Sequence, residues 1–341
     1  MPWPLINISL PDPIVIRPLP LTGLYACMLG TDYLLLKYQH KVPISKNKLR
    51  VIISTVHAAV PLVVVSPSSP ANIAFALLPW FIASYSAFLP MEKFTVKEWL
   101  RSVFETFIDK SPSKGEDVRK LGFAKIIRGT IKLITLTSLV IPALPSDPEY
   151  MLRQPWLSKE SITTTFLIGL DAYLIFGAAD IITGAIQTVS GQKMEDMFDS
   201  PFIATSPRDF WSRRWNRHIR NLLHRQVFRP DTKKEKGFLN SPQGRGILAF
   251  AVSAAFHELI IWSVCRKITL ENFCFFLLHG LACAAEVKYF NKQVPQTKLG
   301  KIGCMMGQMS FMVLTGRLFL APFLRHRFLQ PLPLTEVTVV S

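Results

Sequence analysis

Charged residues are scarce in this sequence, and their scarcity excludes a water-soluble fold. Of 341 residues, 18% are Asp, Glu, Lys or Arg, whereas an ordinary soluble domain carries about 25%. Hydrophobic residues make up 49% of the chain. A fold in water would have too little polar surface with this composition, so we expect an integral membrane protein.

A signal peptide and paired cysteines are also lacking. Residues 1–20 have no basic start and contain six prolines, which forbid a continuous apolar helix, so we expect no cleavable signal peptide. The cysteines show no C-x-x-C spacing and predict neither a disulfide framework nor a zinc site. We interpret them as buried free thiols: Cys27, Cys265, Cys274, Cys283 and Cys304. We expect no bound metal and no permanently bound cofactor.

Hydrophobic residues are present in eight runs, each close to the ~20 residues that a helix needs to cross a bilayer. The runs cover residues 21–38, 49–66, 71–90, 126–145, 162–186, 247–264, 268–287 and 302–324. This pattern predicts an all-α, polytopic transmembrane helical bundle of about eight spans. We divide the chain into an N-terminal segment (1–20), one transmembrane domain (21–324) and a C-terminal tail (325–341).

The formal net charge of +16 would suit a nucleic-acid-binding protein, but the basic residues lie between the apolar runs. Lys and Arg number five in residues 37–50, eight in 91–125 and twelve in 187–246, whereas residues 67–70 contain none. Because basic loops of membrane proteins remain in the cytosol, this distribution predicts topology and not nucleic-acid binding. We expect loop 187–246 to be cytosolic, both termini to lie on the other side, and the protein to reside in the endoplasmic reticulum.

Loop 187–246 contains a helical pattern of its own. Ser206, Pro207 and Asp209 supply an N-cap, a proline at the first helical position and an acid at the third, so a helix should begin near residue 207. From there, apolar residues recur at helical spacing, with the arginines largely off this stripe: Trp211, Trp215, Ile219 and Leu222. An amphipathic, basic helix with tryptophans is typical of a membrane interface.

Ionisable residues inside a bilayer are costly, so each is a functional candidate. The apolar runs contain His57, Asp171, Asp180, His257, Glu258, His279 and Glu286, besides Asp32 and Arg317. His257 lies ten residues into its run, which puts it about 15 Å deep at ~1.5 Å per residue. A neutral imidazole there is suited to accept a proton from a buried alcohol, although a structural hydrogen bond between helices would explain the same position.

Three other patterns have structural interpretations. Asp171 and Asp180 are nine residues apart and would point to opposite faces of one helix, so we expect them to bond backbone or hydroxyl groups. Gly303 and Gly307 form a G-x-x-x-G spacing that predicts close helix packing. His279 and Glu286 share a helix face about 10 Å apart, too far for a direct bond. The sequence leaves open whether His279, Asp171 or Glu286 line a pocket.

Two motifs, taken in order, carry a resemblance to a known family. The string Phe210-Trp211-Ser212-Arg213-Arg214-Trp215-Asn216 is followed about forty residues later by Ser253-Ala254-Ala255-Phe256-His257-Glu258 in an apolar run. The chain thus resembles the membrane-bound O-acyltransferase superfamily, and within it the wax-synthase-like branch. The resemblance is specific over residues 206–262 and only topological before residue 160. It implies that His257 is the catalytic base and Asn216 the assisting residue.

This resemblance implies acyl-CoA as co-substrate, a lipid-soluble alcohol as acceptor and the bilayer as surroundings. His257 would take the hydroxyl proton as the alcohol attacks the thioester carbonyl, and CoA would leave as the thiol. No G-x-S-x-G motif is present, so direct transfer is expected instead of an acyl-enzyme. Four arginines would supply positive charge for the CoA phosphates, although a topological anchor needs the same residues: Arg213, Arg214, Arg217 and Arg220.

Several acceptors are compatible with this chemistry. Wax-synthase-like proteins of this size resemble fungal enzymes that acetylate terpenoid natural products, so we expect acetyl transfer to a terpenoid in secondary metabolism. The alternatives in the same fold are a wax-ester, sterol or glyceride acyltransferase, or an enzyme that acylates a protein or phospholipid. The rival of another class is a transporter whose intramembrane His and Asp residues form an ion path. The sequence specifies neither acyl length nor oligomeric state.

Overall fold

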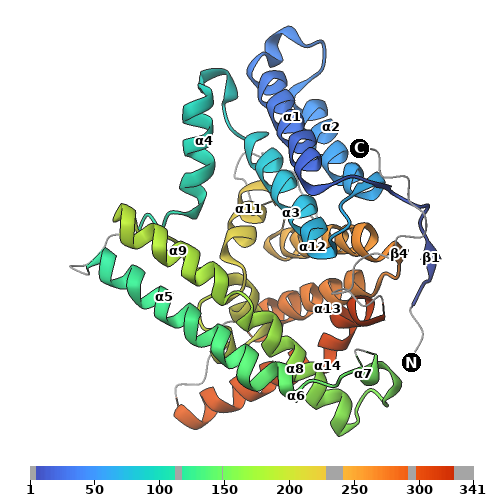
Figure 1. Cartoon of the computed structure of the whole chain (residues 1–341). Coiled ribbons are helices and arrows are strands. Elements are labelled where there is room, and N and C mark those ends of the chain that lie inside the picture. The colour runs from blue at the N-terminus through green and yellow to red at the C-terminus, as the bar shows by residue number, and fades with distance from the viewer. Residues whose placement is uncertain (1–4, 112–116, 148, 228–240, 291–296, 326–341) are drawn as a thin grey trace. The chain divides into compact units, whose positions relative to one another are not determined.

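The structure, a computed structural model, describes residues 5–111, 117–147, 149–227, 241–290 and 297–325. Part of loop 187–246 (228–240) and the tail after residue 325 therefore lie outside the described residues. Figure 1 shows a chain built almost entirely of helices. The helices belong to two compact units. Unit 1 comprises Phe104–Ile247 and Leu278–Leu320, and unit 2 comprises Trp3–Val103, Leu248–Leu277 and Ala321–Ser341.

The helices of the first third of the chain are α1 (Pro18–Lys37), α2 (Lys46–Val63), α3 (Ser69–Ser86) and α4 (Val96–Phe104). The middle third contains α5 (Val118–Thr135), α6 (Ile141–Ala143), α7 (Tyr150–Arg153), α8 (Lys159–Leu174), α9 (Gly177–Ser190), α10 (Pro207–Asp209) and α11 (Arg217–Val227). The remaining helices are α12 (Pro242–Cys265), α13 (Glu271–Ala285) and α14 (Lys298–Arg325). Three π-helical turns follow α5, α10 and α13, at Leu136–Val140, Phe210–Arg214 and Glu286–Phe290.

Six helical stretches in the described part of the chain are long and apolar enough to cross a membrane. They are Pro18–Lys37, Val118–Ala143, Lys159–Ser190, Pro242–Cys265, Glu271–Phe290 and Lys298–Arg325. The predicted all-α, multi-pass architecture is confirmed. The other two predicted spans, 49–66 and 71–90, also fold as helices. However, α2 begins with the basic residues Lys46, Lys48 and Arg50, and the apolar helix Ala71–Ser86 is shorter than a full span.

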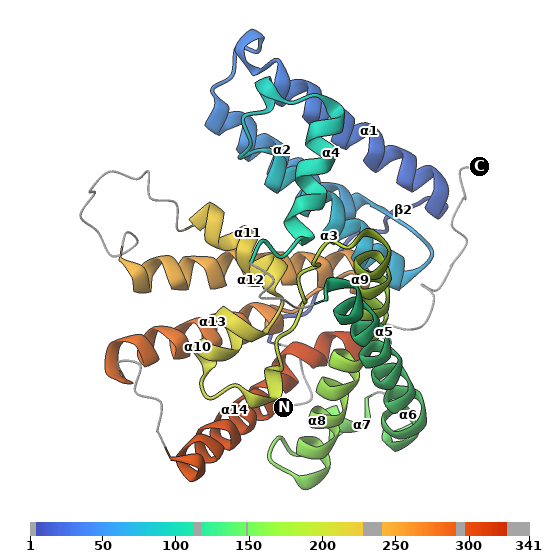
Figure 2. The same cartoon turned by 90° about the vertical axis from the view of Figure 1, so that its left-hand side faces the viewer.

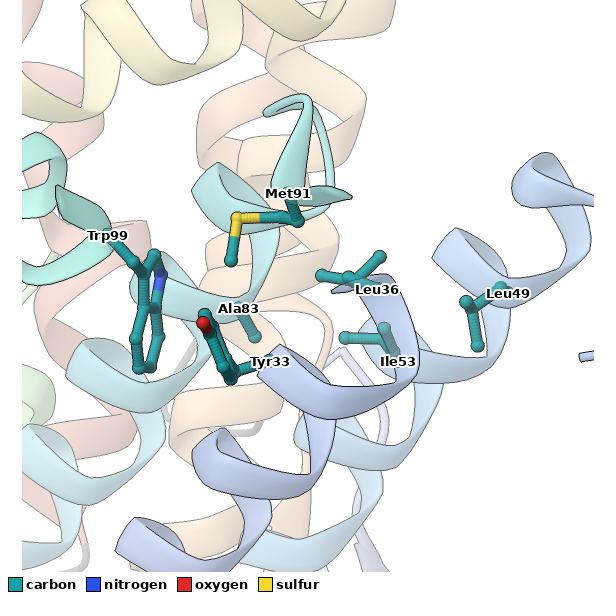
Figure 3. Packing of buried hydrophobic residues seen from close by; sticks show 7 residues of the cluster. All are labelled: Tyr33, Leu36, Leu49, Ile53, Ala83, Met91 and Trp99. Atoms are coloured by element: carbon teal, nitrogen blue, oxygen red, sulfur yellow. The ribbon is translucent and has the colours of Figure 1, made fainter. Parts of the chain in front are cut away.

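The core of unit 2 lies between α1, α2, α3 and α4. Its buried residues are Tyr33, Leu36, Leu49, Ile53, Ala83, Met91 and Trp99, as Figure 3 shows. The rings of Tyr33 and Trp99 pack with centroids 5.2 Å apart. Their polar edges are satisfied, because the Trp99 indole donates to Ser86 Oγ at 2.7 Å and the Tyr33 hydroxyl donates to the Phe94 carbonyl at 3.0 Å. These bonds connect α4 to the helices that precede it.

Polar links hold other parts of unit 2. His57 Nε2 lies 2.6 Å from Asp32 Oδ2 in the buried interior, so these two candidate functional residues join α2 to α1. Two short strand pairs fasten the N-terminal segment. β1 (Ile8–Ser9) pairs antiparallel with β4 (Lys267–Ile268), and β2 (Ile14–Val15) pairs parallel with β3 (Val64–Val65).

In unit 1, glycines bring α5 and α9 into close contact along their length (Figures 1 and 2). A Cβ added to Gly184 would lie 2.7 Å from the Gly122 carbonyl oxygen, and one added to Gly177 would lie 2.6 Å from that of Gly129. Only glycine permits this backbone approach. The prediction of close packing at Gly303 and Gly307 was wrong in location, since no other atoms lie within 4 Å of a Cβ at either position.

A charged cluster lies on the same helix pair. Asp180 of α9 accepts from Lys132 Nζ at 2.8 Å and from Arg128 Nη2 at 2.9 Å, both from α5. The expectation that Asp180 bonds backbone or hydroxyl groups was therefore wrong, because its partners are cations on a neighbouring helix. Asp171 is half-buried in α8. Arg317 of α14 is buried and donates to the carbonyl oxygens of Leu152 and Gln154.

Candidate active site

The predicted helix start after residue 206 is confirmed, but the helix does not continue. The Asp209 amide donates to Ser206 Oγ at 3.1 Å, so Ser206 is the N-cap of α10. A π-helical turn follows over Phe210–Arg214, and the helix ends at Trp215. A new helix, α11, begins at Arg217. The expectation of one amphipathic stripe through Trp211, Trp215 and the residues of α11 was wrong, because the chain turns between the two helices.

Asn216 forms this turn. Its φ is +38°, in the left-handed region that asparagine tolerates better than most residues. Its side-chain Oδ1 accepts from the Ile219 amide at 3.3 Å, and its carbonyl accepts from the Arg220 amide at 3.0 Å. Asn216 thus caps α11 through its side-chain oxygen. Because that oxygen faces the helix, the Nδ2 group of the same amide is directed away from it, with two N–H donors.

The segment that follows α9 holds α11 in place. Glu195 lies 3.2 Å from Arg217 Nη2 and accepts from Asn221 Nδ2 at 3.1 Å. The Arg217 amide also donates to the Met197 carbonyl at 3.0 Å. His218 is buried 3.9 Å from the same glutamate, and its ring packs on Phe107 with centroids 4.9 Å apart. Burial lowers the pKa of His218 despite the attraction of Glu195.

Asp196 fastens this segment to α5. It lies 2.6 Å from Arg128 Nη2 and 3.3 Å from Lys125 Nζ. Burial alone would raise the pKa of the Asp196 carboxyl, but the bonds to these two cations outweigh it and hold the pKa below its ordinary value. Adjacent acidic residues, Glu195 and Asp196, therefore connect α11 to the α5–α9 pair.

The four arginines proposed to bind CoA phosphates differ in their surroundings. Arg214 donates to Asp209 Oδ2 at 2.7 Å, Arg217 pairs with Glu195, and Arg220 donates to the Ser212 carbonyl at 2.8 Å. These three stabilise the loop itself. Arg213 is different, because 77% of its side chain is exposed and its carboxylate contact, to Asp209, is 4.0 Å. Among the four arginines, Arg213 would therefore lose the fewest existing bonds when it binds a phosphate.

His257 lies in the inner part of α12, within unit 2. Eight residues separate it from the end of the helix at Cys265, or about 12 Å at ~1.5 Å per residue. Its Nδ1 lies 2.8 Å from the Ser253 carbonyl oxygen. A carbonyl only accepts, so Nδ1 carries the proton and the neutral ring has its basic lone pair on Nε2. The ring packs on Phe276 of α13, with centroids 4.1 Å apart.

The neighbouring Glu258 has a different task. Its carboxylate is buried and accepts from the Trp262 indole at 3.0 Å and from the Phe273 amide at 3.1 Å. Phe273 lies in the first turn of α13, where backbone N–H groups lack partners within the helix. Glu258 thus satisfies the start of α13 and joins it to α12, which keeps Phe276 against the His257 ring.

His279, a buried histidine of α13, lies in unit 1 and has the opposite tautomer. The Trp211 indole donates to its Nδ1 at 3.0 Å, so Nδ1 carries a lone pair. Its Nε2 lies 2.9 Å from Thr315 Oγ1, which itself donates to the Phe311 carbonyl at 2.7 Å, so Nε2 carries the proton. The basic nitrogen of His279 is therefore occupied by an indole N–H. It cannot act as a base without breaking that bond.

Asn216 belongs to unit 1 and His257 to unit 2, and each is held by contacts within its own unit. Sequence reasoning missed Ser253, whose carbonyl fixes the His257 tautomer four residues away, and Glu195, the anchor of α11. The S-x-x-x-H spacing was a signal for the first, since residues four apart stack along a helix. Among the described residues, no three His, Cys, Asp or Glu side chains gather into a metal site.

Comparison with known proteins concerns the same part of the chain. Residues 194–278 match the model of the membrane bound O-acyl transferase family. The chain is 40% identical over 124 residues to "Probable long-chain-alcohol O-fatty-acyltransferase 1" of Arabidopsis thaliana, which covers 35% of this chain and 36% of that protein. It is 34% identical over 167 residues to "Probable long-chain-alcohol O-fatty-acyltransferase 2" of the same plant, 48% of each protein.

A sterol-related protein is also similar. The chain is 29% identical over 164 residues to "Acyl-CoA--sterol O-acyltransferase 1" of Arabidopsis thaliana, which covers 46% of this chain and 45% of that protein. The chain thus spans between about a third and a half of the length of these curated relatives. The predicted resemblance to membrane-bound O-acyltransferases is confirmed over residues 194–278, which include both motifs. The similarity to the long-chain-alcohol O-fatty-acyltransferases agrees with the wax-synthase-like branch.

Proposed function

We propose that this protein is an acyl-CoA-dependent O-acyltransferase that acylates the hydroxyl of a hydrophobic alcohol in the membrane. The single observation that carries the proposal is the tautomer of His257. Its Nδ1–H donates to the Ser253 carbonyl, so Nε2 is the basic nitrogen in the inner part of an apolar helix. A base of this kind is what an alcohol needs when it attacks a thioester carbonyl.

In this mechanism His257 Nε2 accepts the hydroxyl proton while the alcohol oxygen forms a bond to the acyl carbon. The tetrahedral adduct then collapses, the carbon–sulfur bond breaks, and the thiolate of CoA takes the proton from the imidazolium. The resemblance gives Asn216 the assisting role, and its Nδ2 donors suit the stabilisation of an oxyanion. Its position at the N-terminus of α11, the positive end of the helix dipole, suits the same charge.

The acceptor that we favour is a long-chain alcohol or a sterol, with a fatty acyl group as donor. Support comes from the names of the relatives. Two refer to fatty acyl transfer to long-chain alcohols, and one refers to acyl transfer from acyl-CoA to a sterol. Acetyl transfer to a terpenoid, the first expectation from the sequence, stays a prediction with less support. We propose the endoplasmic reticulum as location because the acceptors are membrane lipids.

The transporter hypothesis has less support from the side chains. Asp32 bonds to His57, Asp180 to Lys132, and Glu258 to the start of α13. These contacts hold three of the intramembrane carboxylates in structural links, whereas an ion path needs them to exchange partners.

The test is thiol release by the purified protein in detergent. We expect CoA thiol to appear from a long-chain acyl-CoA only when a long-chain alcohol or a sterol is added, with an ester as the other product. Acetyl-CoA with a terpenoid alcohol should be used more slowly. Alcohol-independent thiol release, or none with any pair, would contradict the proposal.

The variant that tests the role of His257 as a base is His257→Asn. The asparagine amide retains a donor for the Ser253 carbonyl but has no basic nitrogen. We expect kcat to fall by about 10² to 10⁴, the usual contribution of a general base, while the variant folds normally. If His257→Asn keeps more than about a tenth of the wild-type rate, a different residue must be the base.

A further inference from the structure

One face of α13 and of the π-helical turn that continues it is hydrogen-bonded to the segment that precedes Asn216. His279 and Glu286 are seven residues apart, two helical turns, and so lie on the same face. Both bond to residues 206–211, and all partners belong to unit 1. Figure 2 shows α10 beside this part of the chain. The acyl-transfer mechanism proposed above uses neither residue.

Glu286 holds the start of α10. The Ser206 hydroxyl donates to Glu286 Oε1 at 2.7 Å, and the Arg208 amide donates to Oε2 at 2.9 Å. Ser206 Oγ at the same time accepts from the Asp209 amide, so one serine serves both as cap and as link. Both carboxylate oxygens thus satisfy donors in the first turn of α10, where N–H groups lack helical partners.

His279 holds the π-helical turn one step further along. Its side chain is fully buried, with the Trp211 indole on one nitrogen and Thr315 on the other. The chain of donors runs in one direction, from Trp211 through His279 and Thr315 to the Phe311 carbonyl. Every polar atom in this chain has a partner, and such buried networks fix one arrangement. The ring also packs on Phe311, with centroids 4.6 Å apart.

We propose that His279 and Glu286 are positioning residues for Asn216. They fix the entry of the chain into the turn, and the segment at Glu195 fixes its exit, so that Asn216 keeps its left-handed conformation and a constant direction of its Nδ2 group. The proposal rests on the assisting role of Asn216 given above. Because both residues act through the backbone of another segment, their loss affects the transition state more than the binding of acyl-CoA.

Two measurements test this proposal together: hydrogen exchange of the amides of residues 208–216, and kcat and KM with acyl-CoA. His279→Leu removes the acceptor of the Trp211 bond. We expect exchange in this segment to become about tenfold faster or more, and kcat to fall about tenfold with KM for acyl-CoA unchanged. Trp211→Phe removes the donor and should give the same result. His279→Asn offers an amide oxygen near the position of Nδ1 and should recover both values to within about threefold.

The control is Leu281→Ala, on an exposed position of the same helix, which should leave both measurements unchanged. If hydrogen exchange in this segment is as slow in His279→Leu and Trp211→Phe as in the wild type, the bond between His279 and Trp211 does not hold the segment in place. Faster exchange with an unchanged kcat would overturn the positioning role. If even the wild-type protein transfers no acyl group, the proposed function fails. The exchange result still tests, independently of activity, whether His279 holds this segment in place.

Discussion

Two substitutions at Asn216 separate its two tasks, since its side chain has an acceptor that caps α11 and a donor directed elsewhere. Asn216→Asp keeps an acceptor for the Ile219 amide and tolerates the left-handed backbone. It loses the N–H donors and adds a negative charge. Asn216→Ala loses the cap, worth about 1 kcal/mol, and puts alanine, which tolerates the left-handed region less well than asparagine, at a φ of +38°, which costs roughly 1 kcal/mol more.

If Asn216 serves both tasks, the two variants should lose a similar factor in kcat and should differ in the hydrogen exchange of α11. Removing an oxyanion donor lowers kcat by about 10² to 10³, so Asn216→Asp should lose that factor while hydrogen exchange in α11 stays as in the wild type. Asn216→Ala should lose a similar factor and also show faster exchange, consistent with about 2 kcal/mol of lost local stability. The activity is followed as alcohol-dependent release of CoA thiol.

A capping role alone predicts that only Asn216→Ala loses activity. If Asn216→Asp keeps more than about a tenth of the wild-type kcat while Asn216→Ala is impaired, the residue serves α11 and not the transition state. Asn47→Asp, at an exposed position of α2, controls for the added charge. Combining Asn216→Asp with His257→Asn tests whether the two residues serve one step, because losses in a shared step are less than additive.

Three further predictions concern the loop and the helix pair. Arg213→Glu should raise the KM for acyl-CoA about tenfold without changing hydrogen exchange in the loop, as expected for the loss of one charge-assisted bond; an unchanged KM would make Arg213 a topological anchor only. Because burial lowers the folded pKa of His218, protonation favours the unfolded segment, so stability is lost as the pH falls below about 6.5. The protection factors of the α11 amides, which correct for the slower intrinsic exchange at lower pH, should fall between pH 7 and 5.5, and His218→Phe, which keeps the ring contact with Phe107, should flatten that dependence. Gly184→Val should destabilise the protein by about 1–3 kcal/mol in thermal unfolding, the usual range for overpacking, whereas Gly303→Ala, at an open position, should leave the melting temperature nearly unchanged.

The spans could be predicted from the sequence because apolar runs of helical length are a local property. Pro18–Lys37 and Lys298–Arg325 are examples, and both emerge close to their predicted limits. The break between Trp215 and Arg217 could not be predicted in this way. The periodicity there fits one helix, and the turn depends on partners far away in the sequence, such as Glu195 on one side and Glu286 on the other.

Side-chain pairing could not be predicted from the sequence for the same reason. Arg217 and Arg220 look identical to Arg213 in a charge pattern, yet two of these three are used by the loop itself. Glycine spacing was informative but ambiguous. A seven-residue spacing on each of two helices marks the real contact of Gly122 and Gly129 with α9, whereas a G-x-x-x-G spacing alone does not say whether a partner helix is present.

The two buried histidines of consecutive helices show how identical side chains become chemically different. His257 and His279 each lie in an apolar run, and both were functional candidates for that reason. Their hydrogen-bond partners distinguish the two rings. The Ser253 carbonyl can only accept, so the lone pair of the His257 ring is on Nε2. The Trp211 indole can only donate, so it bonds to the lone pair of His279 on Nδ1. A general base needs its lone pair on a nitrogen that can take a proton, and the lone pair of His279 is already bonded to the Trp211 indole. We therefore propose proton transfer as the role of His257 and the fixing of the Asn216 turn as the role of His279.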